Sequence, residues 1–214
     1  VENGGVVDLD RVVLEHNGDT GVLSIVGSRV TLRHVAVRDG EGAPSATRGI
    51  AVSAQEGGEV VLEGGEIAGH GHGGLLAAGG GHLVARDVVV LDSRGSAPGS
   101  GFGVDADLAG VVELERVLID RAERTGILLR DASTLTAADV LIHEVGIGLI
   151  GDAGTIARVT RMEIDAPSSG VSFVGPDVSV ELTDVTVRGP TGASDGGFGL
   201  TLTRGGSLTI VRAA

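Results

Sequence analysis

The sequence predicts an all-β protein, a parallel β-helix in which short strands stack coil upon coil. Apolar anchor residues recur 22 or 23 residues apart in most coils and 28 to 30 apart in three. Apolar and polar residues alternate after each anchor, and a glycine precedes a second apolar run. The anchors are Val7, Val30, Val60, Leu83, Val112, Leu135, Ala157, Val180 and Leu208. They predict one domain over residues 1–214, with about eight complete coils of three short strands and a partial ninth.

One coil, residues 111–133, shows how the elements are predicted. Alternation with period two indicates strands with one buried face. Glu115 and Arg116 interrupt the alternation, so we expect the first strand to bend there into the second. The third strand follows Gly126. The residues expected in the core are Val112, Leu114, Val117, Ile119, Ile127 and Leu129.

A glycine column marks the start of the third strand. We expect a corner that either needs a positive φ or has no room for a Cβ atom. The predicted column is Gly21, Gly49, Gly74, Gly103, Gly126, Gly148, Gly170 and Gly199.

Charges alternate in sign along the two turn positions between the first and second strands. Stacked coils lie ~4.8 Å apart, so each charge is expected to meet opposite charges in neighbouring coils. The first position is Asp10, Arg33, Glu63, Arg86, Glu115, Ala138, Thr160 and Thr183. The second is Arg11, His34, Gly64, Asp87, Arg116, Asp139, Arg161 and Asp184. The regular alternation favours a structural role for these charged residues over a catalytic one.

An outward strip of Val89, Leu118 and Leu141 is expected on the second strands of three consecutive coils. It is a candidate surface for contact with a polysaccharide or another protein. The alternative is that aliphatic residues simply favour pleated surfaces.

Composition excludes several classes of function. The net charge is −13, which opposes binding to nucleic acids and to anionic membranes. Aromatic residues make up 1% of the chain, so a stacking platform for sugar rings is missing. The absence of cysteine excludes disulfides and thiolate chemistry. No apolar run approaches the ~18 residues of a membrane-spanning helix, so we expect no membrane insertion.

Three long turns, residues 38–48, 91–102 and 188–198, all lie at the same corner of their coils. Insertions confined to one corner usually mark the functional face of a solenoid. A notch between the first two would hold His70 and His72, with Asp105 and Asp107 on the next coil. These four are the candidate catalytic or metal-binding residues, and Ca²⁺ is the ion that the aspartates would hold. The alternative is an ordinary polar surface turn, and Arg130 would compete with any cation.

The coil length and the Val/Leu/Ile ladder resemble the right-handed parallel β-helix repeat proteins of the pectate-lyase-like superfamily, over essentially the whole chain. That superfamily includes polysaccharide lyases, glycoside hydrolases, tailspikes and non-enzymatic bacterial surface proteins, so the resemblance implies a fold and not one activity. Its enzymes cluster Asp, Arg, Lys or His in a groove, often with calcium. This chain has no lysine and no dense aspartate cluster beyond Asp105 and Asp107.

We therefore predict a non-catalytic scaffold or binding domain of a bacterial secreted or cell-surface protein, with no resident cofactor and a carbohydrate as the candidate ligand. The bacterial source follows from the bias toward Gly, Ala, Val and Arg. The alternatives are a polysaccharide lyase or glycoside hydrolase acting at the notch, and an oligomeric fibre segment. We also expect the chain to be part of a longer protein, because its ninth coil has only Leu208 and Ile210 as anchors.

Overall fold

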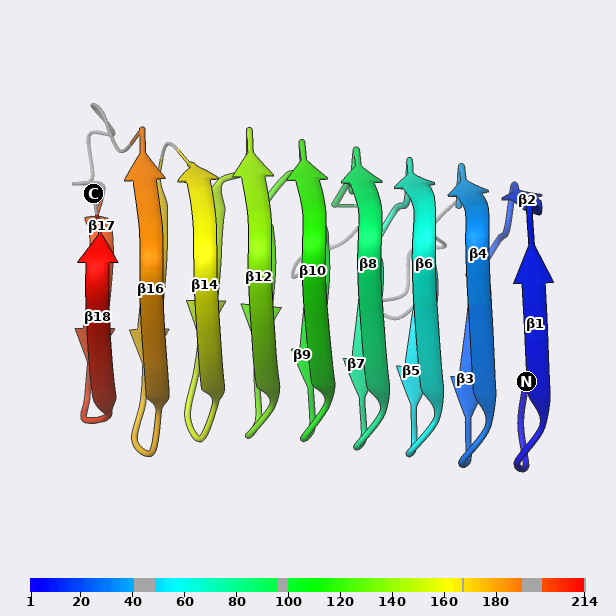
Figure 1. The fold of residues 1–214 in the computed structure, drawn as a ribbon, viewed down its shortest axis with the longest axis horizontal. Helices are drawn as coiled ribbons and strands as arrows, with labels where there is room; N and C mark the ends of the chain where they lie inside the picture. The colour runs from blue at the N-terminus through cyan, green and yellow to red at the C-terminus, as the bar shows by residue number, and fades with distance from the viewer. Residues whose placement is uncertain (41–48, 96–99, 167, 190–197, 214) are drawn as a thin grey trace.

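The structure is a computed structural model that describes residues 1–40, 49–95, 100–166, 168–189 and 198–213. These residues form two parallel sheets (Figure 1). The long-strand sheet contains, in spatial order, β1 (Val6–Asp10), β4 (Arg29–Arg38), β6 (Glu59–Ala68), β8 (His82–Leu91), β10 (Val111–Asp120), β12 (Thr134–His143), β14 (Ile156–Asp165), β16 (Ser179–Arg188) and β18 (Ser207–Ala213), and β2 (Val13–Glu15) also pairs with β4. The short-strand sheet contains β3 (Thr20–Ile25), β5 (Ile50–Gln55), β7 (Gly73–Ala78), β9 (Phe102–Asp107), β11 (Thr125–Leu129), β13 (Ile147–Gly151), β15 (Ser169–Val174) and β17 (Phe198–Thr203).

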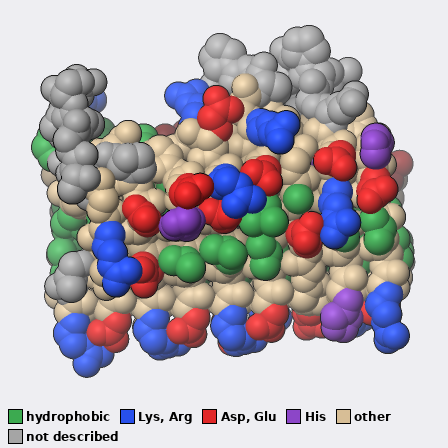
Figure 2. Space-filling model, turned by 90° about the horizontal axis from the view of Figure 1, so that it is seen from above, with side chains coloured by type: hydrophobic (Ala, Val, Ile, Leu, Met, Phe, Trp, Pro, Cys, Tyr) green, Lys and Arg blue, Asp and Glu red, His purple; other side chains and the backbone are tan. Residues whose placement is uncertain are grey.

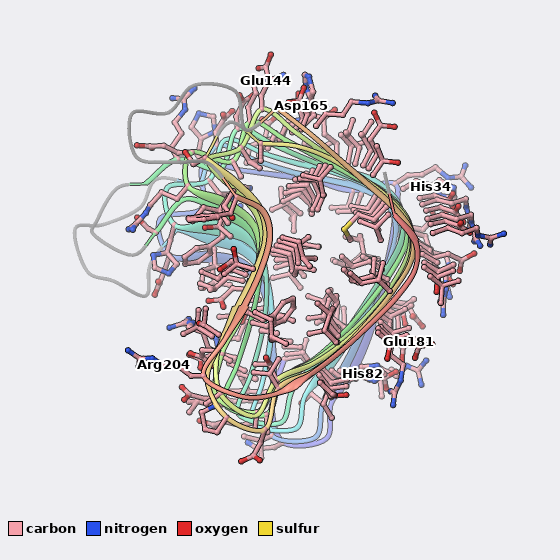
Figure 3. All side chains as sticks on the ribbon, turned by 90° about the vertical axis from the view of Figure 1, so that its left-hand side faces the viewer. His34, His82, Glu144, Asp165, Glu181 and Arg204 are labelled. Atoms are coloured by element: carbon pink, nitrogen blue, oxygen red, sulfur yellow. The ribbon has the colours of Figure 1, made fainter. Side chains whose placement is uncertain are left out.

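The two sheets face each other and enclose the core. The strands of the second sheet run opposite to those of the first, and each long strand with the short strand that follows it forms one coil (Figure 1). Seen end-on, successive coils superpose and their inward side chains fill the interior (Figure 3). The register confirms the anchor column, since Val112 pairs with Leu83 on one side and Leu135 on the other. The architecture is that of a stacked parallel β solenoid.

The core prediction for residues 111–133 is confirmed. Leu114 is 3% exposed, and Ile119, Ile127 and Leu129 are fully buried. Large aliphatic side chains in neighbouring coils contact one another through the stack, so the hydrophobic core is continuous along the molecule.

From the second coil onward, the first two strands predicted for each coil are continuous in the structure. From β4 to β16 each long strand has ten residues and bends at a residue with positive φ, as at Arg116, where φ is 53°. The bend residues are Arg11, His34, Gly64, Asp87, Arg116, Asp139, Arg161, Asp184 and Arg212. A coil therefore has one bent strand and one shorter strand instead of three separate strands.

The glycine column needs one correction. Thr20 pairs with Ile50 and Val22 with Val52, so Ala51, and not Gly49, stacks on Gly21. A Cβ atom on Gly126 would lie 2.5 Å from Ile142 Cγ2 and 2.8 Å from the Gly148 carbonyl oxygen. Gly126 has no positive φ, whereas Gly49 has a φ of 88°. Lack of space explains the glycines of the column up to Gly170, and Gly49 belongs to the turn before it.

The charge ladder is present. At the first turn position it is continuous, since Arg86 lies 4.0 Å from Glu63 and 3.4 Å from Glu115, whereas at the second position it resolves into pairs. Arg116 donates to both oxygens of Asp87, at 2.6 and 2.8 Å. The carboxylate of Asp139 accepts from Arg161 at 2.6 and 2.7 Å. The expected contact of Arg116 with Asp139 is therefore replaced by pairing of each aspartate with the arginine of the following coil.

The outward strip is assembled as expected, since Leu118 pairs with Val89 and Leu141 in the sheet. Leu141 is 40% exposed, and the other two side chains are half-buried. Figure 2 shows a short row of hydrophobic side chains bordered by charged ones on this face.

Each long turn lies partly outside the described residues, which omit residues 41–48, 96–99 and 190–197. Among the residues that the structure describes, no helix is long and apolar enough to cross a membrane.

Candidate functional site

A pocket of about 280 Å³ opens on the outward face of the short-strand sheet. Residues of β9 alternate there, with Val104 and Ala106 in the core and Asp105 and Asp107 outward. The sheet register places Leu76 of β7 beside Asp105. The complete lining is Ile50, Gln55, His72, Leu76, Ala78, Asp105, Asp107 and Arg130.

Arg130 joins the two aspartates. It follows β11, and its Nη2 lies 2.6 Å from Asp105 Oδ2 and 3.2 Å from Asp107 Oδ2. Asp105 is 2% exposed, and burial raises the pKa of its carboxyl to about 6, although Arg130 opposes the shift. Burial also raises the pKa of Asp107. The pair therefore holds a proton more readily than exposed aspartates do.

Four buried polar atoms around this pocket have no hydrogen-bond partner among the described residues. They are Asp105 Oδ1, Asp107 Oδ1, Arg130 Nε and His72 Nδ1. Leaving a buried donor or acceptor unpaired costs ~1–3 kcal/mol, so such atoms rarely gather by chance. Two acceptors, a donor and an imidazole nitrogen of the lining residues are thus left unpaired.

His72 stands at the edge of the pocket. Its ring packs edge-on against Phe102, with ring centroids 5.0 Å apart. Burial and then the nearby charge of Arg130 lower the pKa of the imidazole. The ring is neutral at neutral pH, so Nδ1 either donates or accepts according to its tautomer.

His70 lies apart from this pocket, although it is only two residues from His72. Its side chain is 1% exposed, and Nε2 donates a hydrogen bond of 3.0 Å to the carbonyl of Val37. A Cβ atom on Gly40 would lie 2.3 Å from His70 Nδ1, so the ring occupies the space that this glycine leaves open. Three of the four candidate residues, His72, Asp105 and Asp107, line one pocket, and His70 packs elsewhere.

The guanidinium of Arg130 lies against both carboxylates, where a cation held by Asp105 and Asp107 would bind. A divalent ion would have to displace it, and calcium needs six or more oxygen ligands. The arrangement suits a ligand that both donates and accepts hydrogen bonds.

The contributions of Gln55 and Leu76 were missed from the sequence. The signal was present in the coil alignment, which places Leu76 beside Asp105 and Gln55 one further coil from Asp107. In comparisons with known proteins, no protein-family model, curated protein or solved structure matches the chain.

Proposed function

We propose that the chain is a rigid β-solenoid binding domain whose pocket at Asp105, Asp107 and Arg130 takes a neutral, hydroxyl-rich ligand of the carbohydrate class. The observation that carries the proposal is that four residues lining one pocket each hold a buried polar atom with no hydrogen-bond partner among the described residues. A sugar hydroxyl donates to a carboxylate oxygen and accepts from a guanidinium nitrogen at the same time. One vicinal diol would therefore satisfy both kinds of atom.

The charges also favour a neutral ligand. Two aspartates and one arginine leave the pocket with a net negative charge when both carboxyls are ionised, and the whole chain carries −13. Anionic ligands are therefore disfavoured. The apolar lining residues Ile50, Leu76 and Ala78 offer contact for the C–H faces of a sugar ring. Without an aromatic platform, we expect weak binding to single sugars and tighter binding to chains that extend over neighbouring coils.

The direction of winding, the number of coils and the superfamily are part of the same proposal. Right-handed winding, about eight complete coils and kinship with the pectate-lyase-like superfamily are supported by the parallel pairing and the repeat length. Secretion or display at a bacterial cell surface fits a binding scaffold with no cysteine and a strongly acidic surface.

The test is a titration of isotope-labelled protein with neutral oligosaccharides, followed by amide chemical shifts. We expect shifts at β7, β9 and β11 in the wild type and their loss in Asp107→Asn. Glu181→Gln is the matched control, because it removes a carboxylate on the long-strand sheet (Figure 3). Shifts that survive in Asp107→Asn, or no shifts with any neutral saccharide, would contradict the proposal.

One observation favours a second candidate, a polysaccharide lyase or glycoside hydrolase. A carboxyl whose pKa is about 6 holds its proton in part at neutral pH and suits general acid catalysis. Asp105 would donate the proton and Asp107 would supply the second carboxyl group. Release of reducing ends or of unsaturated products by the wild type, and its loss in Asp105→Asn, would favour the enzyme.

A further inference from the structure

A second polar cluster lies where three adjacent long strands end. Asp120 ends β10, His143 ends β12 and pairs with it in the sheet, and Asp165 ends β14. Glu144 follows His143, and Figure 3 shows Glu144 and Asp165 at the same corner of the coil. Figure 2 shows acidic, basic and histidine side chains gathered beside the hydrophobic row. This corner belongs to the long-strand sheet, so it is separate from the pocket at Asp105.

The potential ligand atoms are close together. His143 Nδ1 lies 2.9 Å from Asp120 Oδ1. One ligand atom each from Asp120, His143 and Glu144 fall within 4.8 Å of one another. Asp120 is buried, whereas Glu144 is exposed. The second nitrogen of the imidazole, Nε2, lies 3.8 Å from Asp165 Oδ2.

The surrounding charges leave an excess of carboxylates. Arg121 donates to both oxygens of Asp92, at 2.8 and 3.1 Å, and to Asp120 Oδ2. That pairing leaves Asp120 Oδ1 directed at His143, and Arg121 acts on Glu144 through its charge. The corner is therefore negatively charged in spite of Arg121, and it attracts cations.

We propose that this corner is a divalent metal site, in which His143 Nδ1, Asp120 Oδ1 and the carboxylate of Glu144 bind a first-row transition metal ion such as Zn²⁺. Ligands of zinc lie about 2.0–2.2 Å from the ion in a tetrahedral arrangement, so two of them are about 3.3–3.6 Å apart. The 2.9 Å contact between His143 Nδ1 and Asp120 Oδ1 is a hydrogen bond, and the ion would replace it as the two ligand atoms separate by about 0.5 Å. An imidazole and two carboxylates are a donor set for zinc and its neighbours, whereas calcium requires more oxygen atoms than this corner offers.

Asp165 acts as the positioning residue in this arrangement. When Nδ1 binds the metal, Nε2 carries the proton, and the carboxylate of Asp165, now 3.8 Å away, would accept it after moving within hydrogen-bond distance. Such a carboxylate fixes the tautomer and the orientation of the ring.

The ion would join neighbouring coils, because Asp120 belongs to β10 and His143 to β12. Binding to the folded state alone raises stability as the concentration of free metal rises. The inference does not depend on a ligand in the pocket at Asp105.

The experiment is calorimetric titration of the whole chain with ZnCl₂ at pH 7.5, together with thermal melting with and without the metal. We expect binding near one equivalent in the wild type and a higher melting temperature with zinc. His143→Asn should abolish both effects, Glu144→Gln should weaken them, and Asp165→Asn should weaken binding by about tenfold. His82→Asn is the matched control, because His82 also contacts one carboxylate, Glu113 at 3.0 Å, but lies on another face (Figure 3).

Three results would overturn the proposal of a metal site at this corner, and a fourth would contradict one of its ligands. No heat above buffer in the wild type overturns the proposal, and so does equal binding by His143→Asn. Equal loss in His82→Asn and His143→Asn would indicate nonspecific binding and would also overturn it. Because Glu144 is exposed, Glu144→Gln should fold normally, and its unchanged affinity would contradict the assignment of this ligand.

Discussion

Asp105 combines deep burial with a single charged partner, and this combination makes the folded state sensitive to pH. Its carboxyl is 2% exposed and its pKa is raised to about 6 from 3.8. The folded state therefore binds the proton more tightly than the unfolded state does. The resulting stabilisation is complete below pH 3.8 and is lost as the pH rises through about 6.

Asp105→Asn should remove this contribution, because an amide does not titrate. Between pH 4 and pH 7 the free energy of unfolding of the wild type should fall relative to that of the variant by about 2 kcal/mol. Chemical denaturation of both proteins at the two pH values measures the difference. Carboxylates away from the pocket titrate alike in both proteins and cancel, whereas Asp107, which shares Arg130 with Asp105, contributes to the difference. Parallel pH profiles for the two proteins would show that Asp105 has an ordinary pKa.

At the scale of the element, the glycine column determines how closely the short strands approach the bent ones. A Cβ atom on Gly148 would lie 2.3 Å from Ile164 Cγ2 and 2.6 Å from the Gly170 carbonyl oxygen. The last glycine of the column, Gly199, has no atom within 4 Å of the same position. The chain thus contains its own control for the effect of crowding.

Gly148→Ala should destabilise the protein by ~1–3 kcal/mol, because the clash with backbone cannot be relieved by a side-chain rotation. Gly199→Ala should change the stability little. Denaturant midpoints of the two variants test the difference. If both alanines are tolerated equally, crowding does not explain the column.

The charge ladder makes a prediction about pairing between coils. A double-mutant cycle on Arg116 and Asp87 should show favourable coupling that weakens as salt is added, because their two hydrogen bonds are exposed. The cycle on Arg116 and Asp139 should show less coupling, since Asp139 bonds to Arg161. Urea denaturation at low and high salt supplies both measurements, and equal coupling in the two cycles would mean that the ladder is not paired.

At the scale of the whole molecule, the repeat made most of the fold predictable. The anchor column and the charge columns are correct because each lies at a constant distance from its neighbours in the coil. Gly49 was misplaced because it follows a long turn, where that distance is lost, and a glycine before an isoleucine matched the pattern. Only the strand pairing shows that Ala51, and not Gly49, occupies the column position beside Gly21.

The candidate site was predictable to the extent that it depends on stacking. Asp105 and Asp107 share a strand face, and His72 precedes the neighbouring strand, so their proximity follows from the coil order. The direction of His70 depends on a hydrogen bond to Val37 within a turn that does not repeat. The cluster at His143 was missed because its members lie at strand ends, which were treated as turns, although Asp120 and His143 occupy equivalent positions in consecutive coils.

Because each aspartate pairs with the arginine of the next coil, deleting an odd or an even number of coils should have different effects. Deleting one coil, residues 111–133, would stack β8 on β12 and place Asp87 beside Asp139. Deleting two coils, residues 111–155, would stack β8 on β14 and place Asp87 beside Arg161, which restores an attractive pair.

Added salt should therefore stabilise the one-coil deletion relative to the two-coil deletion, and melting curves of both at low and high NaCl would reveal it. The same response to salt in the two variants would show that the number of deleted coils does not affect the pairing. If the salt responses differ in this way, the aspartate–arginine pairs survive only when coils are gained or lost in even numbers.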